Sequence, residues 1–568
     1  MPHLGTKLLL SLLIPAYAVI CATDTHIIVD TKQGRVKGYQ ITSQSGYSLQ
    51  VFLGIPYAEP PVGDLRFSRP IPAGSWRGIH DATFYRPVCP QKLQFLHTFS
   101  FGYNFNNTYE DCLYLNVFAP TNGSKLPVMV WIHGGAYTYG SASEYDGRML
   151  ASRGIVVVTV DYRLGVMGFL STGNNAAPGN FGHLDQLQAL HWVKDNIGQF
   201  GGDPDKVTIF GQSSGGAGVS THMFSPLAKG LFRGVIAQSG ISISPFAFYR
   251  PPYKASDTAR NLGEIVGCNQ SSSQALVSCL RGKSVDDLVN ARPQGAPMTS
   301  KYVPVVDGYY ILDFPENLLG QGRVLHPALM TGTVLNEGAD MIDYLRGVEK
   351  GVSAQTAQQV IHSWSRRYLN QTATAYKAAA CHYNIHSADP VVNRQNLIAF
   401  WSDYDYVTPN IKMVDMYHKI QPNTYMYSFE YRSVNQPDPQ WEGVLHATEL
   451  YYVFGCPFSN TMPCPWEGCN TTWCSGWGVS PLDKKISNEM MTMWTNFAKS
   501  LDPNSAGNIR LWPHYSVSAH RPYLQIRDTS NVQHGLRPSA ANFWNRYFPN
   551  LLAGKAGLHE CHGGVITG

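Results

Sequence analysis

Two periods of apolar residues alternate along the first half of the chain. Ile155–Val160 is apolar at nearly every position, as in a parallel strand buried on both faces. Val207–Phe210 is a second strand-like run, and between the two lies Leu184–Ile197, whose apolar residues recur at helical spacing. Strands that alternate with helices pair in parallel through crossover helices. The pattern predicts an α/β fold with a large, mostly parallel central sheet flanked by helices.

Shorter strand patterns precede this region. Thr25–Asp30 and Gly34–Gly38 are predicted to form strands, the second as part of a hairpin, and Pro127–Ile132 is a further alternating segment. No internal repeat and no linker divides the chain. We therefore expect one domain over residues 23–555, followed by a short tail at 556–568.

The N-terminus is typical of a secretory signal peptide. Lys7 is followed by the apolar run Leu8–Ile20, which is too short to cross a bilayer, and Ala16–Ala18 or Ile20–Ala22 offers a cleavage pattern of small residues. Residues 1–22 are therefore expected to be removed, a membrane anchor being the alternative. We expect a secreted, extracellular protein without a stable membrane anchor.

Composition excludes two classes of protein. Of 568 residues, 44% are hydrophobic and 14% charged, which is unlike a disordered chain or a nucleic-acid-binding protein built on basic patches. The formal net charge of +4 indicates no particular partner.

Sequons and cysteines agree with export. Of eleven cysteines, Cys21 belongs to the predicted signal peptide, which leaves ten for an oxidising compartment. Candidate N-glycosylation sites occur at Asn106, Asn122, Asn269, Asn370 and Asn470.

One motif carries candidate chemistry. Gly211–Gly215 matches G-x-S-x-G, with a strand pattern before it and a run of small residues after it that can begin a helix. This strand–turn–helix context is required of a nucleophile elbow, whereas the bare motif is often only a turn. Gly211 and Gly215 lack a Cβ, which allows a sharp turn that exposes the hydroxyl of Ser213. Ser213 is the candidate nucleophile.

Further segments, in the same order along the chain, resemble the type-B carboxylesterase/cholinesterase family of the α/β-hydrolase fold. The likeness covers about residues 25–550 and is closer to a general carboxylesterase than to a cholinesterase. The segments that carry it are Glu110–Asn116, Gly179–Gln186, Phe200–Pro204, Gln238–Gly240 and Trp494–Lys499.

The resemblance implies a catalytic triad. It places the acid at Glu337, within Gly332–Gly338, and the base at His446, within Gly443–Leu450, in the order serine, acid, histidine. Taken alone, Glu337 would be a solvated carboxylate and His446 a structural histidine. The resemblance also assigns the oxyanion hole to the backbone N–H groups of Gly135, Ala136 and Ser214. Ala136 departs from an all-glycine loop, a change expected to cost little flexibility. No cofactor or metal is implied.

Two departures concern the substrate. Cholinesterases have a tryptophan ten residues before the second cysteine of their first disulfide loop, where this chain has Gly102, and a glutamate before the nucleophile, where it has Gln212. Gln212 instead resembles the G-Q-S-x-G motif of juvenile hormone esterases. Met298–Pro304 lacks the paired phenylalanines that narrow the acyl pocket of acetylcholinesterases, so a roomier acyl side is expected. Candidate pocket residues are Phe101, Tyr103, Gln212, Phe246, Met298 and Ser300.

The resemblance also implies two disulfides, Cys89–Cys112 and Cys268–Cys279. The third bridge of the family is expected to be absent because Thr408 stands where a cysteine would be. The cluster between Cys456 and Cys474 is read as two local disulfides, with a zinc site as the alternative. Cys561 can pair with Cys381 or join two chains into a homodimer. The six cysteines without an assigned partner are Cys381, Cys456, Cys464, Cys469, Cys474 and Cys561.

The leading hypothesis is a secreted serine carboxylesterase that hydrolyses uncharged carboxylic esters, as small-molecule substrates, through an acyl-enzyme intermediate. The competing class is a non-catalytic adhesion protein similar to neuroligins, which have lost the nucleophile. Within the enzymes, cholinesterase, juvenile-hormone-esterase-like and lipase activities are alternatives. Ser213, Glu337 and His446 are all present, which favours an enzyme.

Overall fold

A computed structural model describes residues 25–43, 46–92, 108–293, 301–461, 474, 478–504 and 512–558. Several residues singled out above lie outside this part of the chain, and the predictions made for them stay predictions. They are residues 1–22, Phe101, Gly102, Tyr103, Asn106, Met298, Ser300, Cys464, Cys469, Asn470 and Cys561.

Thirteen strands among the described residues form one sheet, in the order β1-β2-β3-β5-β7-β6-β8-β9-β10-β11-β12-β13, with β4 paired to β2. Their bounds are β1 Thr25–Asp30, β2 Arg35–Thr42, β3 Ser48–Pro56, β4 Ile79–Asp81, β5 Tyr114–Pro120, β6 Leu126–Ile132, β7 Val156–Val160, β8 Gly202–Gln212, β9 Gly234–Gln238, β10 Ala328–Val334, β11 Thr424–Phe429, β12 Pro522–Ile526 and β13 Asn531–His534.

The central strands are parallel and the edges are antiparallel. Neighbours from β7 through β6, β8, β9, β10 and β11 to β12 pair in parallel. The N-terminal strands β1, β2, β3 and β5 pair antiparallel up to β7, as do β12 and β13. This arrangement confirms the predicted α/β fold with a mostly parallel centre.

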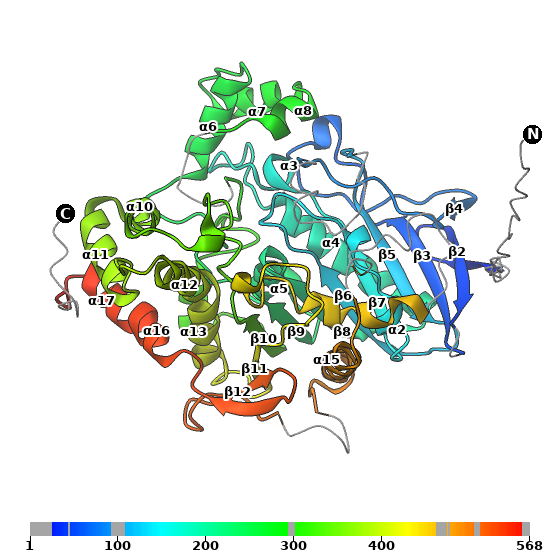
Figure 1. Cartoon of the computed structure of the whole chain (residues 1–568). Coiled ribbons are helices and arrows are strands. Elements are labelled where there is room, and N and C mark those ends of the chain that lie inside the picture. The colour runs from blue at the N-terminus through cyan, green and yellow to red at the C-terminus, as the bar shows by residue number, and fades with distance from the viewer. Residues whose placement is uncertain are drawn as a thin grey trace, which may run out of the picture.

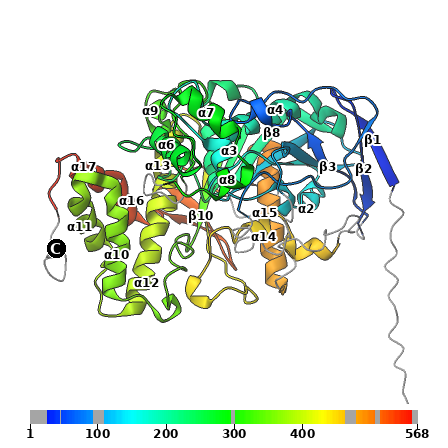
Figure 2. The ribbon, with the colours of Figure 1, turned by 90° about the horizontal axis from the view of Figure 1, so that it is seen from above.

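Helices cover both faces of the sheet. Those at α10–α12 and α16–α17 gather at the end of the molecule opposite β1–β3, in both views (Figures 1 and 2). The bounds are α2 Arg148–Ala151, α3 Gly165–Phe169, α4 Phe181–Asn196, α5 Ser214–His222, α6 Ala255–Ile265, α7 Ser273–Arg281, α8 Val285–Asn290, α9 Pro315–Gly320, α10 Ala354–Ser365, α11 Thr372–His382, α12 Pro390–Trp401, α13 Thr408–Tyr417, α14 Leu450–Val453, α15 Pro481–Ser500, α16 Pro538–Asn542 and α17 Phe548–Leu552.

The buried strands supply two cores because successive side chains of a strand point to opposite faces. In β6, Val128 and Val130 belong to the core that contains residues of α4 and α5, whereas Met129 and Trp131 belong to the core that contains residues of α15. A strand apolar on both faces is thereby buried between two helical layers. This burial holds the C-terminal ends of the parallel strands, where the candidate site lies, in fixed positions.

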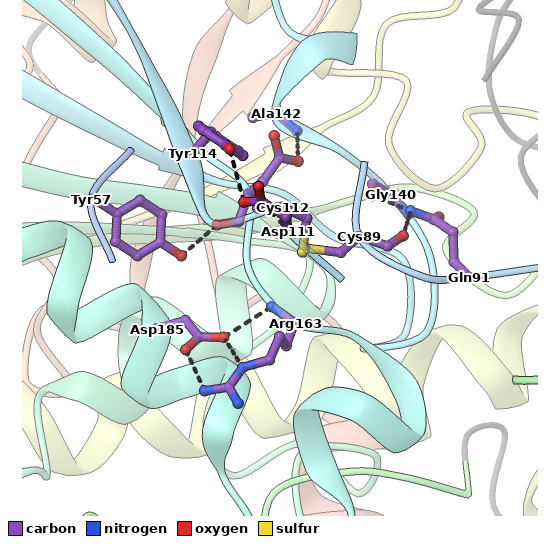
Figure 3. Close-up of a disulfide and its surroundings, with 11 residues drawn as sticks. Tyr57, Cys89, Gln91, Asp111, Cys112, Tyr114, Gly140, Ala142, Arg163 and Asp185 are labelled. Atoms are coloured by element: carbon purple, nitrogen blue, oxygen red, sulfur yellow. Dashed lines mark hydrogen bonds and ion pairs between the residues drawn. A yellow bond between two sulfur atoms is a disulfide. The ribbon is translucent and has the colours of Figure 1, made fainter. Parts of the chain in front are cut away.

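Both disulfides implied by the resemblance are confirmed, Cys89–Cys112 and Cys268–Cys279. Close to the first, the carboxamide of Gln91 both donates to and accepts from the backbone of Gly140, at 3.0 and 2.8 Å (Figure 3). The loop closed by this disulfide therefore supports the segment that follows Gly135 and Ala136.

A third bridge joins Cys456 to Cys474, so one local disulfide of the cysteine cluster is confirmed. Cys381 is disulfide-bonded as well, with its partner outside the described residues.

Exposure of the sequons can be judged at two positions. Asn122 and Asn269 are both exposed, and Asn370 lies in the short helix η6 (Arg366–Gln371). Among the helices of the described segments, none combines the length and the apolar character that crossing a bilayer requires.

Candidate active site

Ser213 sits on a sharp turn between β8 and α5. Its backbone has φ 57° and ψ −125°, a conformation rare for a residue with a side chain and worth about 1–3 kcal/mol of strain. The turn is held by hydrogen bonds from Ser213 N–H to Gln238 O at 2.8 Å and from Ala217 N–H to Ser213 O at 2.9 Å. The strand–turn–helix prediction for this motif is therefore confirmed.

The neighbouring glycines are required for close packing. A Cβ on Gly215 would lie 2.1 Å from Ile132 O, and one on Gly240 would lie 2.0 Å from Ser213 O. Neither Gly211 nor Gly215 is among the residues with positive φ. The sharp turn assigned to these glycines from the sequence is thus made by Ser213 itself, while the glycines let β6 and β8 approach the start of α5.

Glu337 and His446 form a buried pair. Glu337 follows β10 and is fully buried, and its Oε1 accepts from Val334 N–H at 2.8 Å. Its Oε2 lies 2.5 Å from His446 Nδ1, on the loop between β11 and α14. A carboxylate only accepts hydrogen bonds, so Nδ1 carries the proton and Nε2 of the neutral ring is the acceptor.

The histidine reaches the elbow through Gln212. Gln212 Nε2 lies 3.0 Å from His446 Nε2, and Ser213 is the next residue in the chain. The fold therefore brings the elbow, the histidine and the glutamate together from three separate segments.

Carboxylates around His446 set its charge. Burial alone would lower the pKa of His446, but Glu337, Asp340 and Glu449 together outweigh burial and raise that pKa to about 9. Burial in turn raises the pKa of Asp340 to about 6 and that of Asp405 to about 7. Asp340, Asp405 and Tyr406, whose ring centroid lies 4.8 Å from that of His446, were missed from the sequence. The only available signal was that Asp340 lies three residues after Glu337.

The raised pKa, together with the predicted role of His446 as catalytic base, predicts how esterase activity depends on pH. His446 can accept a proton only while neutral, so kcat/KM for p-nitrophenyl butyrate should rise with pH through an apparent pKa above 6.5. Asp340→Asn removes one of the carboxylates and should move this limb to lower pH. A limb at or below 6.5 would contradict the expectation.

Folding raises the pKa of His446, so protonation of this residue stabilises the folded state. This stabilisation is complete below about pH 6.5 and is lost as pH rises through about 9.

The candidate oxyanion loop follows β6. Gly135 has φ 106° and Ala136 has φ 53°, and a Cβ on Gly135 would lie 1.9 Å from Tyr139 O. The loop is tied to α5 because Tyr137 N–H donates to Ser214 Oγ at 3.1 Å. Ala136 adopts a left-handed conformation that costs a residue with a Cβ about 1–2 kcal/mol, more than the sequence argument expected.

Of the candidate pocket residues, two are described. Gln212 contacts the histidine, as stated above. Phe246 packs against Tyr406 with ring centroids 5.5 Å apart and so belongs to the shell around His446. No group of three His, Cys, Asp or Glu side chains in the described segments is arranged to hold a metal ion.

A mostly parallel sheet with a serine on a strand–turn–helix elbow and a buried glutamate–histidine pair beside it defines an α/β-hydrolase. The model of the Carboxylesterase family matches residues 25–544, and the chain belongs to that family. Carboxylesterase 5A of Canis lupus familiaris is 35% identical over 97% of this chain and 94% of its own length. Cholinesterase of Mus musculus is 34% identical over 95% and 89%, and Neuroligin-3 of Mus musculus is 33% identical over 97% and 72%. The family resemblance seen in the sequence is confirmed.

Proposed function

We propose that this carboxylesterase-family protein is a secreted serine esterase that hydrolyses uncharged carboxylic esters. One observation carries the proposal: the hydrogen-bonded chain from Glu337 through His446 to the residue beside Ser213. A serine hydroxyl needs a base and a group that orients that base, and this chain supplies both. The disulfides and the exposed sequons at Asn122 and Asn269 support the secretory part of the proposal.

In the proposed mechanism, Ser213 Oγ attacks the ester carbonyl carbon while His446 Nε2 takes its proton. The N–H groups of Gly135, Ala136 and Ser214 donate to the oxyanion of the tetrahedral intermediate. The intermediate collapses, the C–O bond to the alcohol breaks, and His446 returns the proton to that oxygen. Water then attacks the acyl-enzyme with His446 as base, while Glu337 stabilises the imidazolium.

A second candidate substrate is an ester that carries a positive charge. Asp340 Oδ1 is buried without a hydrogen-bond partner among the described residues, and Asp340 lies close enough to His446 to act on its pKa. The positive charge of an ammonium group would compensate a buried carboxylate at this position. The neutral Gln212 beside the nucleophile favours an uncharged ester instead.

The experiment compares esters on the mature protein. We expect hydrolysis of p-nitrophenyl acetate, butyrate and longer acyl esters, little hydrolysis of butyrylthiocholine or emulsified long-chain triglyceride, and no activity in Ser213→Ala. Preference for thiocholine would move the proposal to a cationic ester, and preference for the emulsion to a lipase. A folded wild-type protein that is inert on every ester would overturn the enzymatic function and favour a binding role similar to that of neuroligins.

A further inference from the structure

The side chain of Gln212 lies between the two halves of the candidate site. It is only 3% exposed, and its Nε2 is 3.0 Å from His446 Nε2. On the other side, a Cβ on Gly134 would lie 2.9 Å from Gln212 Oε1. The carboxamide thus fills the space between the oxyanion loop and the imidazole, and Gly134 leaves room for it.

The protonation of His446 fixes which group donates in this contact. Glu337 accepts from Nδ1–H, so the lone pair of the neutral ring is on Nε2, and the N–H of Gln212 donates to it. Proton transfer from Ser213 needs this same lone pair. Among the described residues, no hydrogen bond joins Ser213 Oγ to the ring. In this structure the amide occupies the acceptor that the serine needs.

We propose that Gln212 is a positioning residue that caps Nε2 of His446 whenever the ring is neutral and must release it before Ser213 can be deprotonated. The proposal rests on the esterase function argued above. Once Nε2 is protonated, it and the amide N–H would be two donors facing each other, so the carboxamide turns to present Oε1. A carboxamide can hydrogen-bond to both states of the ring and a carboxylate only to the protonated state, whereas a thioether cannot donate and accepts only weakly.

The groups that face His446 from other elements are Glu337, Asp340, Asp405, Glu449 and the ring of Tyr406. All of them are unchanged in substitutions at Gln212. A change in the pH profile of such a variant therefore reports on the carboxamide.

The test measures the reaction of the elbow serine with diethyl p-nitrophenyl phosphate, without any ester substrate. The Oγ–P bond forms, the P–O bond to p-nitrophenolate breaks, the serine proton passes to His446, and the released p-nitrophenolate is measured. Gln212→Met should react about three- to tenfold faster on the alkaline side of the profile, because one hydrogen bond no longer has to be broken. Gln212→Glu should shift the rising limb to higher pH, because a carboxylate stabilises the imidazolium.

A matched control is Gln50→Met. Gln50 is also buried, on β3, and donates to Phe200 O at 3.3 Å. Its substitution should leave the phosphorylation rate and the pH profile unchanged.

Three results overturn the proposal. In the first, Gln212→Met keeps its melting temperature and reacts no faster than the wild type. In the second, Gln212→Met does not fold, and the rising limb of the pH profile of Gln212→Glu is unmoved or lies at lower pH than that of the wild type. If the wild type itself is not phosphorylated, the esterase function fails together with this inference, whereas equal phosphorylation of wild type and Gln212→Met overturns the role of Gln212 alone.

Discussion

Glu337→Gln is expected to lower kcat/KM for p-nitrophenyl butyrate by about 10⁴-fold while leaving the fold intact. In the wild type, Val334 N–H donates to Oε1 and His446 Nδ1–H donates to Oε2. The Val334 N–H will keep the amide oxygen at the first position, so the NH₂ group faces Nδ1. The ring must then carry its proton on Nε2 and cannot accept a proton from Ser213.

The control removes a carboxylate elsewhere on the same sheet. Glu430 follows β11 and accepts from Ser428 Oγ at 2.9 Å and from Gln525 Nε2 at 2.6 Å. Glu430→Gln should keep kcat/KM within a few-fold of the wild type. Activity of Glu337→Gln within tenfold of the wild type, at an unchanged melting temperature, would show that the glutamate does not hold the tautomer of the base.

The fold was predictable where burial of an element produces a simple pattern of apolar residues in the sequence. Parallel strands buried on both faces produce continuous apolar runs, and the runs at 155–160 and 207–210 became β7 and β8. Boundaries were less predictable. The helix expected from Leu184 begins at Phe181, directly after Asn180 in a left-handed conformation, because tertiary packing and not periodicity decides where the helix starts. The antiparallel order of the N-terminal strands has no local signal, since it depends on pairing between distant segments.

The residues of the candidate site also differ in whether a local sequence pattern predicts them. Ser213 carries a local signal because the elbow is built from residues adjacent in sequence. Glu337 and His446 are 109 residues apart, and a single glutamate or histidine has no local pattern, so only the family resemblance placed them. The contact of Gln212 with His446 spans 234 residues and depends on the direction of a side chain, which no motif encodes. The burial of Asp340 beside the imidazole was invisible for the same reason.

Asp185→Asn is expected to lower the free energy of unfolding by about 3–5 kcal/mol. Asp185, on α4, accepts from Arg163 Nε and Nη2, both at 2.7 Å, and from Arg163 N–H at 3.1 Å (Figure 3). The two side chains are only 3% and 0% exposed. The amide removes the negative charge and leaves the buried guanidinium without its compensating carboxylate. Urea denaturation followed by tryptophan fluorescence measures the loss.

The comparison is with an exposed ion pair of similar length. Lys194 Nζ lies 2.6 Å from Asp205 Oδ1, with side chains 38% and 80% exposed, so Asp205→Asn should change stability by less than about 1 kcal/mol. The double variant Arg163→Met/Asp185→Leu should recover part of the lost free energy of unfolding, because it removes the buried guanidinium together with its carboxylate partner. A double variant no more stable than Asp185→Asn would mean that the hydrogen bond from Arg163 Nη1 to Ser68 O at 2.7 Å, and not the unpaired charge, dominates the energy of this pair. Gly165 N–H, two residues after Arg163, donates to Tyr137 O at 2.6 Å. Loss of the pair in Asp185→Asn should therefore also displace the candidate oxyanion loop and lower kcat.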